Sequence, residues 1–207
     1  STFVWLGADT LAQQPLLGLP GGRSALRAGD VNDDGRMDIV TAIFQPHPMP
    51  GGVRVFLNKG APRYYEAEPD LFLQGDSAAD ATTMWGVTNN RPDGVSIVDF
   101  NGDGNSDLLV KTTENSGGMF SYGLFVGPYP FRPAPDLYLD PPSYAKKIEC
   151  SVAHMYGDVN GDRATDILLQ FVWEDSLGGR NAGWFLYLGG PFRETPGTIL
   201  YLDRAAH

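Results

Sequence analysis

One nine-residue pattern occurs three times in the chain and constrains its fold more than any other feature. Each copy reads Asp-x-Asn-x-Asp-x-x-x-Asp, and the copies occupy residues 30–38, 99–107 and 158–166. Their first residues lie 69 and 59 positions apart, so the chain repeats about every 60 residues. Internal repetition at such a period indicates a row of similar structural units.

The residue types in these windows suit a hard cation. Oxygen ligands at positions 1, 3 and 5, a main-chain carbonyl at position 7 and a carboxylate at position 9 can surround Ca²⁺ within one tight turn. Gly35 and Gly104 permit that turn at position 6, whereas the third window has Arg163 there, and we expect a less relaxed loop. Asp, Asn and Gly also form ordinary turns. Three copies at similar separations nevertheless favour three calcium sites.

The net charge supports this interpretation. The chain has 25 acidic and 15 basic residues, for a formal charge of −10. Ten of the acidic residues are aspartates inside the windows, and the remaining 15 balance the 15 basic residues. An acidic chain without a basic face is a poor nucleic-acid partner, and no apolar run of about 18 residues predicts a membrane span. The single cysteine, Cys150, can form no internal disulfide, and we expect it to be a small buried residue.

The segments around each window predict short strands. The twelfth positions hold Thr41, Val110 and Leu169 instead of the bidentate Glu of an EF-hand. Apolar, β-rich runs follow the windows at 39–44, 108–112 and 167–173. Another strand precedes each window, and two more follow a Gly-rich turn. Four strands in about 60 residues, without helical periodicity, predict one antiparallel blade of a β-propeller.

These residues resemble the FG-GAP repeat, the blade of the integrin α-subunit head and of many secreted bacterial proteins. The loops and the strands that follow them carry the resemblance. The Phe-Gly and Gly-Ala-Pro flanks are poorly kept, since residues 42–44, 112–114 and 171–173 stand in place of Gly-Ala-Pro. The resemblance implies an all-β propeller fold and three Ca²⁺ sites. The implied ligands are Asp30, Asn32, Asp34, Asp38 and the Arg36 carbonyl; Asp99, Asn101, Asp103, Asp107 and the Asn105 carbonyl; and Asp158, Asn160, Asp162, Asp166 and the Ala164 carbonyl.

The strand count predicts about three and a half blades. A half blade at 1–22 precedes full blades at 23–75, 76–140 and 141–207. Propellers close with roughly four to eight blades, so we expect a partial propeller. The chain is then part of a longer polypeptide, pairs with a second copy, or is completed by another subunit. The first and third alternatives are favoured, because a second copy brings the same half blade twice.

The sequence contains no recognisable catalytic centre. His47, His154 and His207 stand in no Ser-His-Asp order and no zinc-ligand spacing, so we expect a non-enzymatic protein. The longest insertion, residues 75–94, is the candidate ligand-binding loop. Its aromatic, amide and basic side chains suit a protein or glycan ligand, namely Trp85, Asn89, Asn90 and Arg91.

These features predict a calcium-stabilised, extracellular binding, adhesion or scaffold module, secreted or on the cell surface. Calcium loops of extracellular modules fill at the millimolar calcium found outside cells. The alternatives are a glycan-binding lectin of the propeller type and an accessory domain of a secreted enzyme.

Overall fold

The computed structural model shows an all-β protein. It describes residues 2–4, 17–19, 24–43, 52–74, 83–85, 94–114, 119–139, 147–174, 177–191 and 202–203. No helix occurs among these residues, and hence this part of the chain has no apolar helix able to cross a membrane. A short antiparallel pair, β1 (Thr2–Val4) and β2 (Leu17–Leu19), precedes three larger sheets.

The first and third of these larger sheets are antiparallel meanders in which consecutive strands are neighbours. The first sheet has the order β3-β4-β5-β6 and the third has the order β12-β13-β14-β15. The first sheet contains β3 (Ser24–Gly29), β4 (Asp38–Ile43), β5 (Gly52–Phe56) and β6 (Leu71–Gln74). The third contains β12 (Lys147–Gly157), β13 (Asp166–Glu174), β14 (Arg180–Tyr187) and β15 (Leu202–Asp203). The prediction of four-stranded antiparallel units is confirmed for both.

The second sheet has five strands where four were predicted. It contains β7 (Thr83–Trp85), β8 (Val95–Val98), β9 (Asp107–Glu114), β10 (Met119–Phe125) and β11 (Leu137–Leu139). Both β7 and β8 pair with β9: β8 lies along its first half and β7 along its second half. The additional strand therefore shares the edge position that β12 alone occupies in the third sheet. Within the insertion at 75–94, β7 thus pairs with the part of β9 that β8 leaves uncovered.

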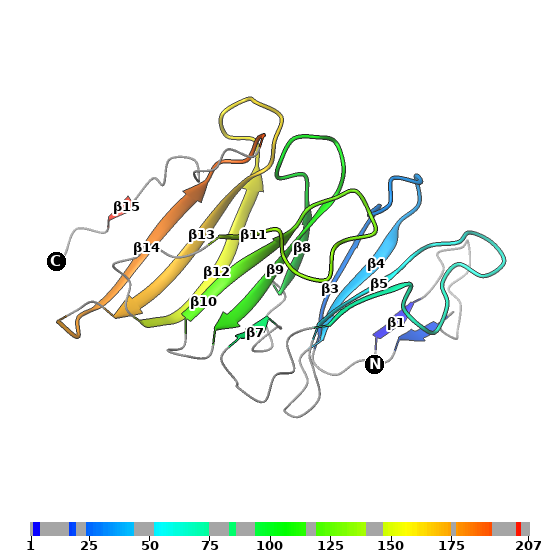
Figure 1. Cartoon of the computed structure of the whole chain (residues 1–207), viewed down its shortest axis with the longest axis horizontal. Helices are drawn as coiled ribbons and strands as arrows, with labels where there is room; N and C mark the ends of the chain where they lie inside the picture. Colours follow the sequence, from blue (N-terminus) through cyan, green and yellow to red (C-terminus); the bar gives the residue numbers. More distant parts are fainter. Residues whose placement is uncertain are drawn as a thin grey trace, which may run out of the picture.

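Two hydrophobic clusters join the three sheets into one row. One contains buried residues of the first and second sheets, including Val31, Val53 and Phe125. The other contains buried residues of the second and third sheets, including Phe100 and Phe185. Figure 1 shows the sheets side by side, with β3 next to β8 and β10 next to β12, as their contacts also require. This face-to-face stacking of meanders is the arrangement of propeller blades.

The alternation of burial along β13 shows which face of the third sheet packs against the second. Along β13 every second residue is buried, and the residues between them are partly buried. The buried ones are Ile167, Leu169, Phe171 and Trp173. Successive side chains of a strand point to opposite faces, so one face of this strand meets the second sheet. The predicted unit boundaries at 22/23, 75/76 and 140/141 lie outside the described residues.

Candidate metal centres

All three aspartate-rich windows lie at one edge of the row of sheets. Each window connects the first long strand of its sheet to the second, namely β3 to β4, β8 to β9 and β12 to β13. Figure 1 shows the three turns at the top of the view, one above each sheet. The windows, hereafter loop 1 (30–38), loop 2 (99–107) and loop 3 (158–166), thus occupy equivalent positions in successive units.

The first aspartate of each loop organises the turn by accepting main-chain hydrogen bonds. In loop 1, Asp30 Oδ2 accepts the N–H of Gly35 at 2.7 Å. In loop 2, Asp99 Oδ1 and Oδ2 accept the N–H groups of Gly102 and Gly104 at 2.9 and 3.0 Å. Asp158 makes the corresponding bonds in loop 3 to residues 161, 162 and 163. The N–H of Arg163 contributes most to lowering the pKa of Asp158 below its usual range.

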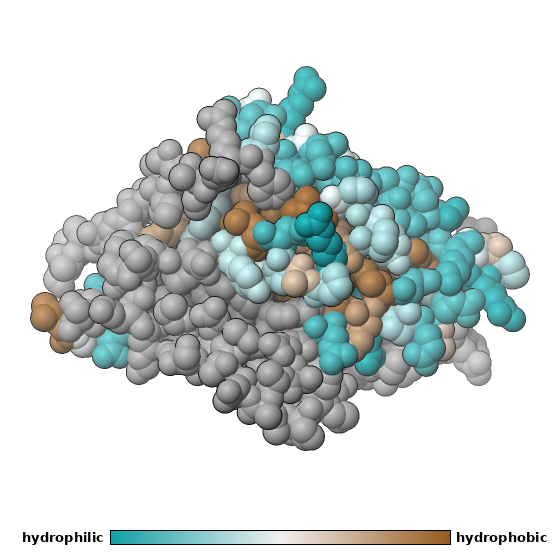
Figure 2. Space-filling model, in the orientation of Figure 1, coloured by the Kyte–Doolittle hydropathy of each residue, from teal (hydrophilic) through white to brown (hydrophobic). Residues whose placement is uncertain are grey.

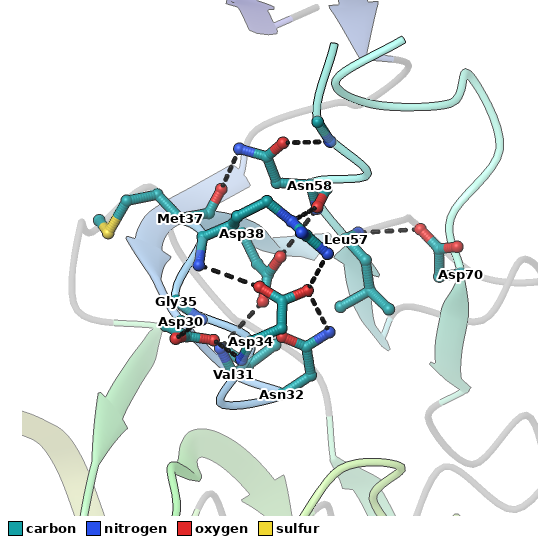
Figure 3. Close-up of polar contacts among 12 residues, drawn as sticks. Asp30, Val31, Asn32, Asp34, Gly35, Met37, Asp38, Leu57, Asn58 and Asp70 are labelled. Atoms are coloured by element: carbon teal, nitrogen blue, oxygen red, sulfur yellow. Dashed lines mark hydrogen bonds and ion pairs between the residues drawn. The ribbon is translucent and has the colours of Figure 1, made fainter.

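The Asn at position 3 and the Asp at position 5 also have the same contacts in every loop. The Asn amide donates to the Asp carboxylate at 3.0 Å in loop 1 and at 2.9 Å in loops 2 and 3. The other oxygen of that Asp accepts the N–H of position 7. Desolvation raises the pKa of Asp34, but the hydrogen bonds from Asn32 and Arg36 and the Arg36 charge outweigh it, and the pKa is lowered. Figure 3 shows this arrangement in loop 1.

The last aspartate of each loop is buried and holds the loop to the sheet. Its side chain is 0% exposed at Asp38 and Asp107 and 2% exposed at Asp166. In loop 2, the N–H groups of Phe100 and Gly127 donate to the two oxygens of Asp107 at 2.9 and 2.8 Å. Asp38 and Asp166 have equivalent pairs of donors. Desolvation by burial raises the pKa of Asp38 and of Asp107.

Positions 4 and 6 have left-handed backbone conformations. Gly35 and Gly104 have φ values of 82° and 88°, which glycine adopts without strain. Arg163 has φ 74° at the same position of loop 3. A left-handed conformation costs an L-residue about 1–2 kcal/mol. Loop 3 therefore has a non-glycine residue in the left-handed region at position 6, where loops 1 and 2 have glycine, whereas loop 1 has one at position 4, Asp33, with φ 58°.

The donor set of loop 1 fits a calcium ion. Asn32 Oδ1 is buried and has no hydrogen-bond partner among the described residues. Such an oxygen is costly unless something binds to it. Each ionised carboxylate has about four acceptor positions, so Asp30 and Asp38 retain capacity beyond the N–H groups that they accept. Residues 30, 32, 34 and 38, with the carbonyl of residue 36, would hold the cation.

Carboxylates alone do not form a metal site in the described residues. No group of three or more His, Cys, Asp and Glu side chains converges there closely enough to hold a metal ion. The ligand set implied by the loop pattern also uses an Asn amide oxygen and a main-chain carbonyl, so it does not depend on carboxylates alone.

Neighbouring loops contact each other directly. Ser106 Oγ, at position 8 of loop 2, donates to the carbonyl of Asp30 in loop 1 at 2.8 Å. At the next junction, Thr165, at position 8 of loop 3, donates its main-chain N–H to the carbonyl of Asp99 at 2.7 Å. The N–H of Gly190 also donates to the Phe100 carbonyl at 2.7 Å. A side chain on Gly189 would collide with that same carbonyl.

Sequence reasoning missed these junction residues and a second set of carboxylates. Asp70 Oδ2 accepts the N–H of Leu57 at 2.8 Å, and Asp136 Oδ2 accepts the N–H of Val126 at 2.9 Å. Both aspartates directly precede the last strand of their sheet. The shared Asp-Leu at 70–71 and 136–137 was the available signal for these carboxylates.

The candidate ligand-binding loop lies largely outside the described residues. Trp85 is the last residue of β7, where its backbone pairs with that of Thr112. Asn89, Asn90 and Arg91 lie outside the described part, as do His47 and His207. Cys150 and His154 are strand residues of β12. Apart from Trp85, the predicted ligand loop therefore lies outside the described residues.

The fold and the loops define a class of protein: an all-β repeat protein whose antiparallel units each carry an Asp- and Asn-rich loop between their first two long strands. The family comparison agrees, because residues 30–110 match the model of the FG-GAP-like repeat. This match confirms, over residues 30–110, the resemblance recognised in the sequence. The match contains loops 1 and 2, and loop 3 shares their contacts. No curated protein matches the chain.

Proposed function

We propose that this chain is a calcium-stabilised, non-catalytic binding or adhesion module that acts outside the cell. One observation carries the proposal: three loops with the same oxygen-rich contacts lie at one edge of three adjacent sheets. FG-GAP-like repeats form propeller-type binding modules, which supports the functional class. The millimolar calcium outside cells suits loops of this kind and supports the location.

Calcium would supply positive charge where the loops concentrate negative charge. Loop 2 contains three carboxylates within nine residues, those of Asp99, Asp103 and Asp107. The chain itself orients the first and last of them, because main-chain N–H groups of the loop and of Gly127 donate to these carboxylates. A bound cation would reduce their mutual repulsion and stiffen the edge of the sheets. In this proposal the loops are structural, and the ligand binds to surfaces that they hold in place.

We also propose that further blades or another subunit complete the propeller. The evidence is the second position of each loop. Val31 is 0% exposed and Phe100 is 6% exposed, because the next sheet covers each of them. Val159, the equivalent residue of loop 3, is 64% exposed. Because the equivalent residue is buried in the other two loops, the exposed Val159 supports the packing of another blade on this side of the third sheet. Figure 2 shows apolar patches between the hydrophilic residues of one face.

The experiment that tests the calcium proposal is thermal unfolding with and without calcium. A ligand that binds only the folded state stabilises it by RT ln(1 + [L]/Kd). With 1 mM calcium and a Kd of about 10⁻⁴ M, each site contributes about 1.4 kcal/mol. We expect chelator to lower the melting temperature by several degrees and added calcium to restore it, while magnesium at the same concentration restores less. An identical melt in chelator and in calcium would overturn the proposal.

A further inference from the structure

Residue 8 of loop 2 and residue 8 of loop 3 each contact the preceding loop. Ser106 lies between the carbonyl-ligand position, Asn105, and the buried carboxylate of Asp107. Its hydroxyl donates to the main-chain carbonyl of Asp30, 76 residues earlier in the sequence. Asp30 is the first ligand position of loop 1, so a single hydrogen bond joins two candidate sites.

The same junction recurs between loops 2 and 3, with a different donor. Here the main-chain N–H of Thr165 donates to the carbonyl of Asp99, the first ligand position of loop 2. The two loops are also in close contact, since a Cβ added to Gly102 would lie 3.2 Å from the Cβ of Ala164. Ala164 is the carbonyl-ligand position of loop 3 and is 1% exposed. The contact is thus a property of the repeat.

We propose that residue 8 positions the first ligand of the preceding loop, so that calcium in one loop raises the affinity of the loop before it. The inference rests on the calcium function proposed above. Binding at loop 2 fixes residues 105 and 107, and the Ser106 hydroxyl between them is then held in its donating position. The Asp30 main chain is restrained with it, and loop 1 loses less conformational entropy when it binds its own ion. Because linkage is reciprocal, calcium bound in loop 1 raises the calcium affinity of loop 2 by the same factor.

The two junctions differ in a way that provides a matched control. Replacement of Ser106 by Ala removes the donor at the first junction. Replacement of Thr165 by Ala keeps the main-chain N–H that forms the second junction. Both substitutions delete a hydroxyl at the same repeat position. The proposal requires that Ser106→Ala abolish the coupling between loops 1 and 2, and that Thr165→Ala leave the coupling between loops 2 and 3 intact. Ser106→Thr keeps a hydroxyl and should restore the coupling.

Calcium titration followed by NMR of the loop glycine amides tests the coupling in the full chain. The N–H of Gly35 reports on loop 1 and that of Gly104 on loop 2, because each donates to the first aspartate of its loop. We expect Asp103→Ala, which disables loop 2, to shift the Gly35 midpoint to at least about fivefold higher calcium. In the Ser106→Ala background, Asp103→Ala should add no further shift. Thr165→Ala should leave the Gly104 midpoint unchanged.

The outcomes separate failure of the coupling from failure of the calcium function. If no glycine amide responds to calcium, the proposed function is wrong. If Gly35 and Gly104 respond, but the Gly35 midpoint is indifferent to Asp103→Ala, the coupling alone is wrong. An equal Asp103→Ala shift with Ser or Ala at 106 would assign the coupling to another contact. The Gly161 amide of loop 3 shows in the same spectra whether each variant is folded.

Discussion

Asp107 Oδ1 accepts the main-chain N–H of Gly127 at 2.8 Å, and this bond fastens the end of loop 2 to the segment that directly follows β10. The other oxygen accepts the N–H of Phe100 at the start of the loop. The carboxylate therefore both closes the loop and joins it to the sheet. It has this structural role in addition to the ligand role that the sequence pattern implies.

Asp107→Asn should destabilise the fold even without calcium. The amide presents a donor where the carboxylate accepted one, so a buried N–H loses its partner at a cost of about 1–3 kcal/mol. Asp103 is exposed, and Asp103→Asn should change stability in chelator by no more than about 0.5 kcal/mol. Urea unfolding in chelator and in calcium measures both variants. Equal losses for the two variants in chelator would show that Asp107 has no separate structural role.

Arg163→Gly should stabilise the chain. Arg163 has φ 74°, and relief of the left-handed conformation offsets the greater entropy of glycine in the unfolded chain to leave a gain of about 0.5–1 kcal/mol. The reverse change in loop 2, Gly104→Arg, should destabilise by a similar amount, because φ is 88° there. Denaturant midpoints of both variants check the prediction, and it is contradicted if Arg163→Gly lowers the midpoint.

Val31→Ser and Val159→Ser should differ strongly in their effect on the free energy of unfolding, although both change position 2 of a loop. Val31 is 0% exposed within the cluster between the first and second sheets, and its loss should cost about 2 kcal/mol. Val159 is 64% exposed, and its replacement should change the stability of this chain by no more than about 0.5 kcal/mol. Thermal unfolding of dilute samples provides the comparison. A large loss for Val159→Ser would mean that something already covers the third sheet in solution.

Acid should weaken loop 3 through Asp158. The Arg163 N–H and three further main-chain N–H groups lower its pKa in the folded chain below the usual 3.8. A carboxyl group with a lowered folded pKa stabilises the fold above its unfolded pKa, and that contribution is lost as the pH falls through the folded pKa. Asp158→Asn should therefore lose stability at pH 7 in chelator and differ less from wild type near pH 2. Parallel curves of stability against pH for the two proteins would be inconsistent with this assignment.

Much of the fold and of the loop geometry could be predicted because it depends on local sequence. Asp30 and Asp38 bracket a turn whose glycine at position 6 needs a positive φ, and the apolar run after residue 38 forms β4 as expected. The strain at Arg163 could likewise be predicted from local sequence, because Arg163 stands at position 6, where loops 1 and 2 have glycine. Local chemistry did not reveal that β7 and β8 share one partner strand, because Trp85 and Val95 are separated by an insertion and brought into line only by β9.

The contacts between units could not be predicted from the windows. Ser106 reads as an ordinary turn residue until the second sheet stacks on the first and brings its hydroxyl to Asp30. Asp70 likewise reads as a surface acid, although its carboxylate accepts the N–H of Leu57 across a 13-residue connection. Both roles depend on tertiary placement, which a repeat period of about 60 residues constrains only loosely.

The different donors at the two loop junctions have an evolutionary consequence. A single codon change at residue 106 removes the hydroxyl that reaches Asp30. The bond from residue 165 to Asp99 belongs to the peptide backbone, and every amino acid except proline preserves it. Selection can therefore tune or abolish the first junction in one step, whereas the second is inherited with the fold and tolerates sequence drift. Among related chains, residue 106 should record how tightly each lineage needs its first two units to act together.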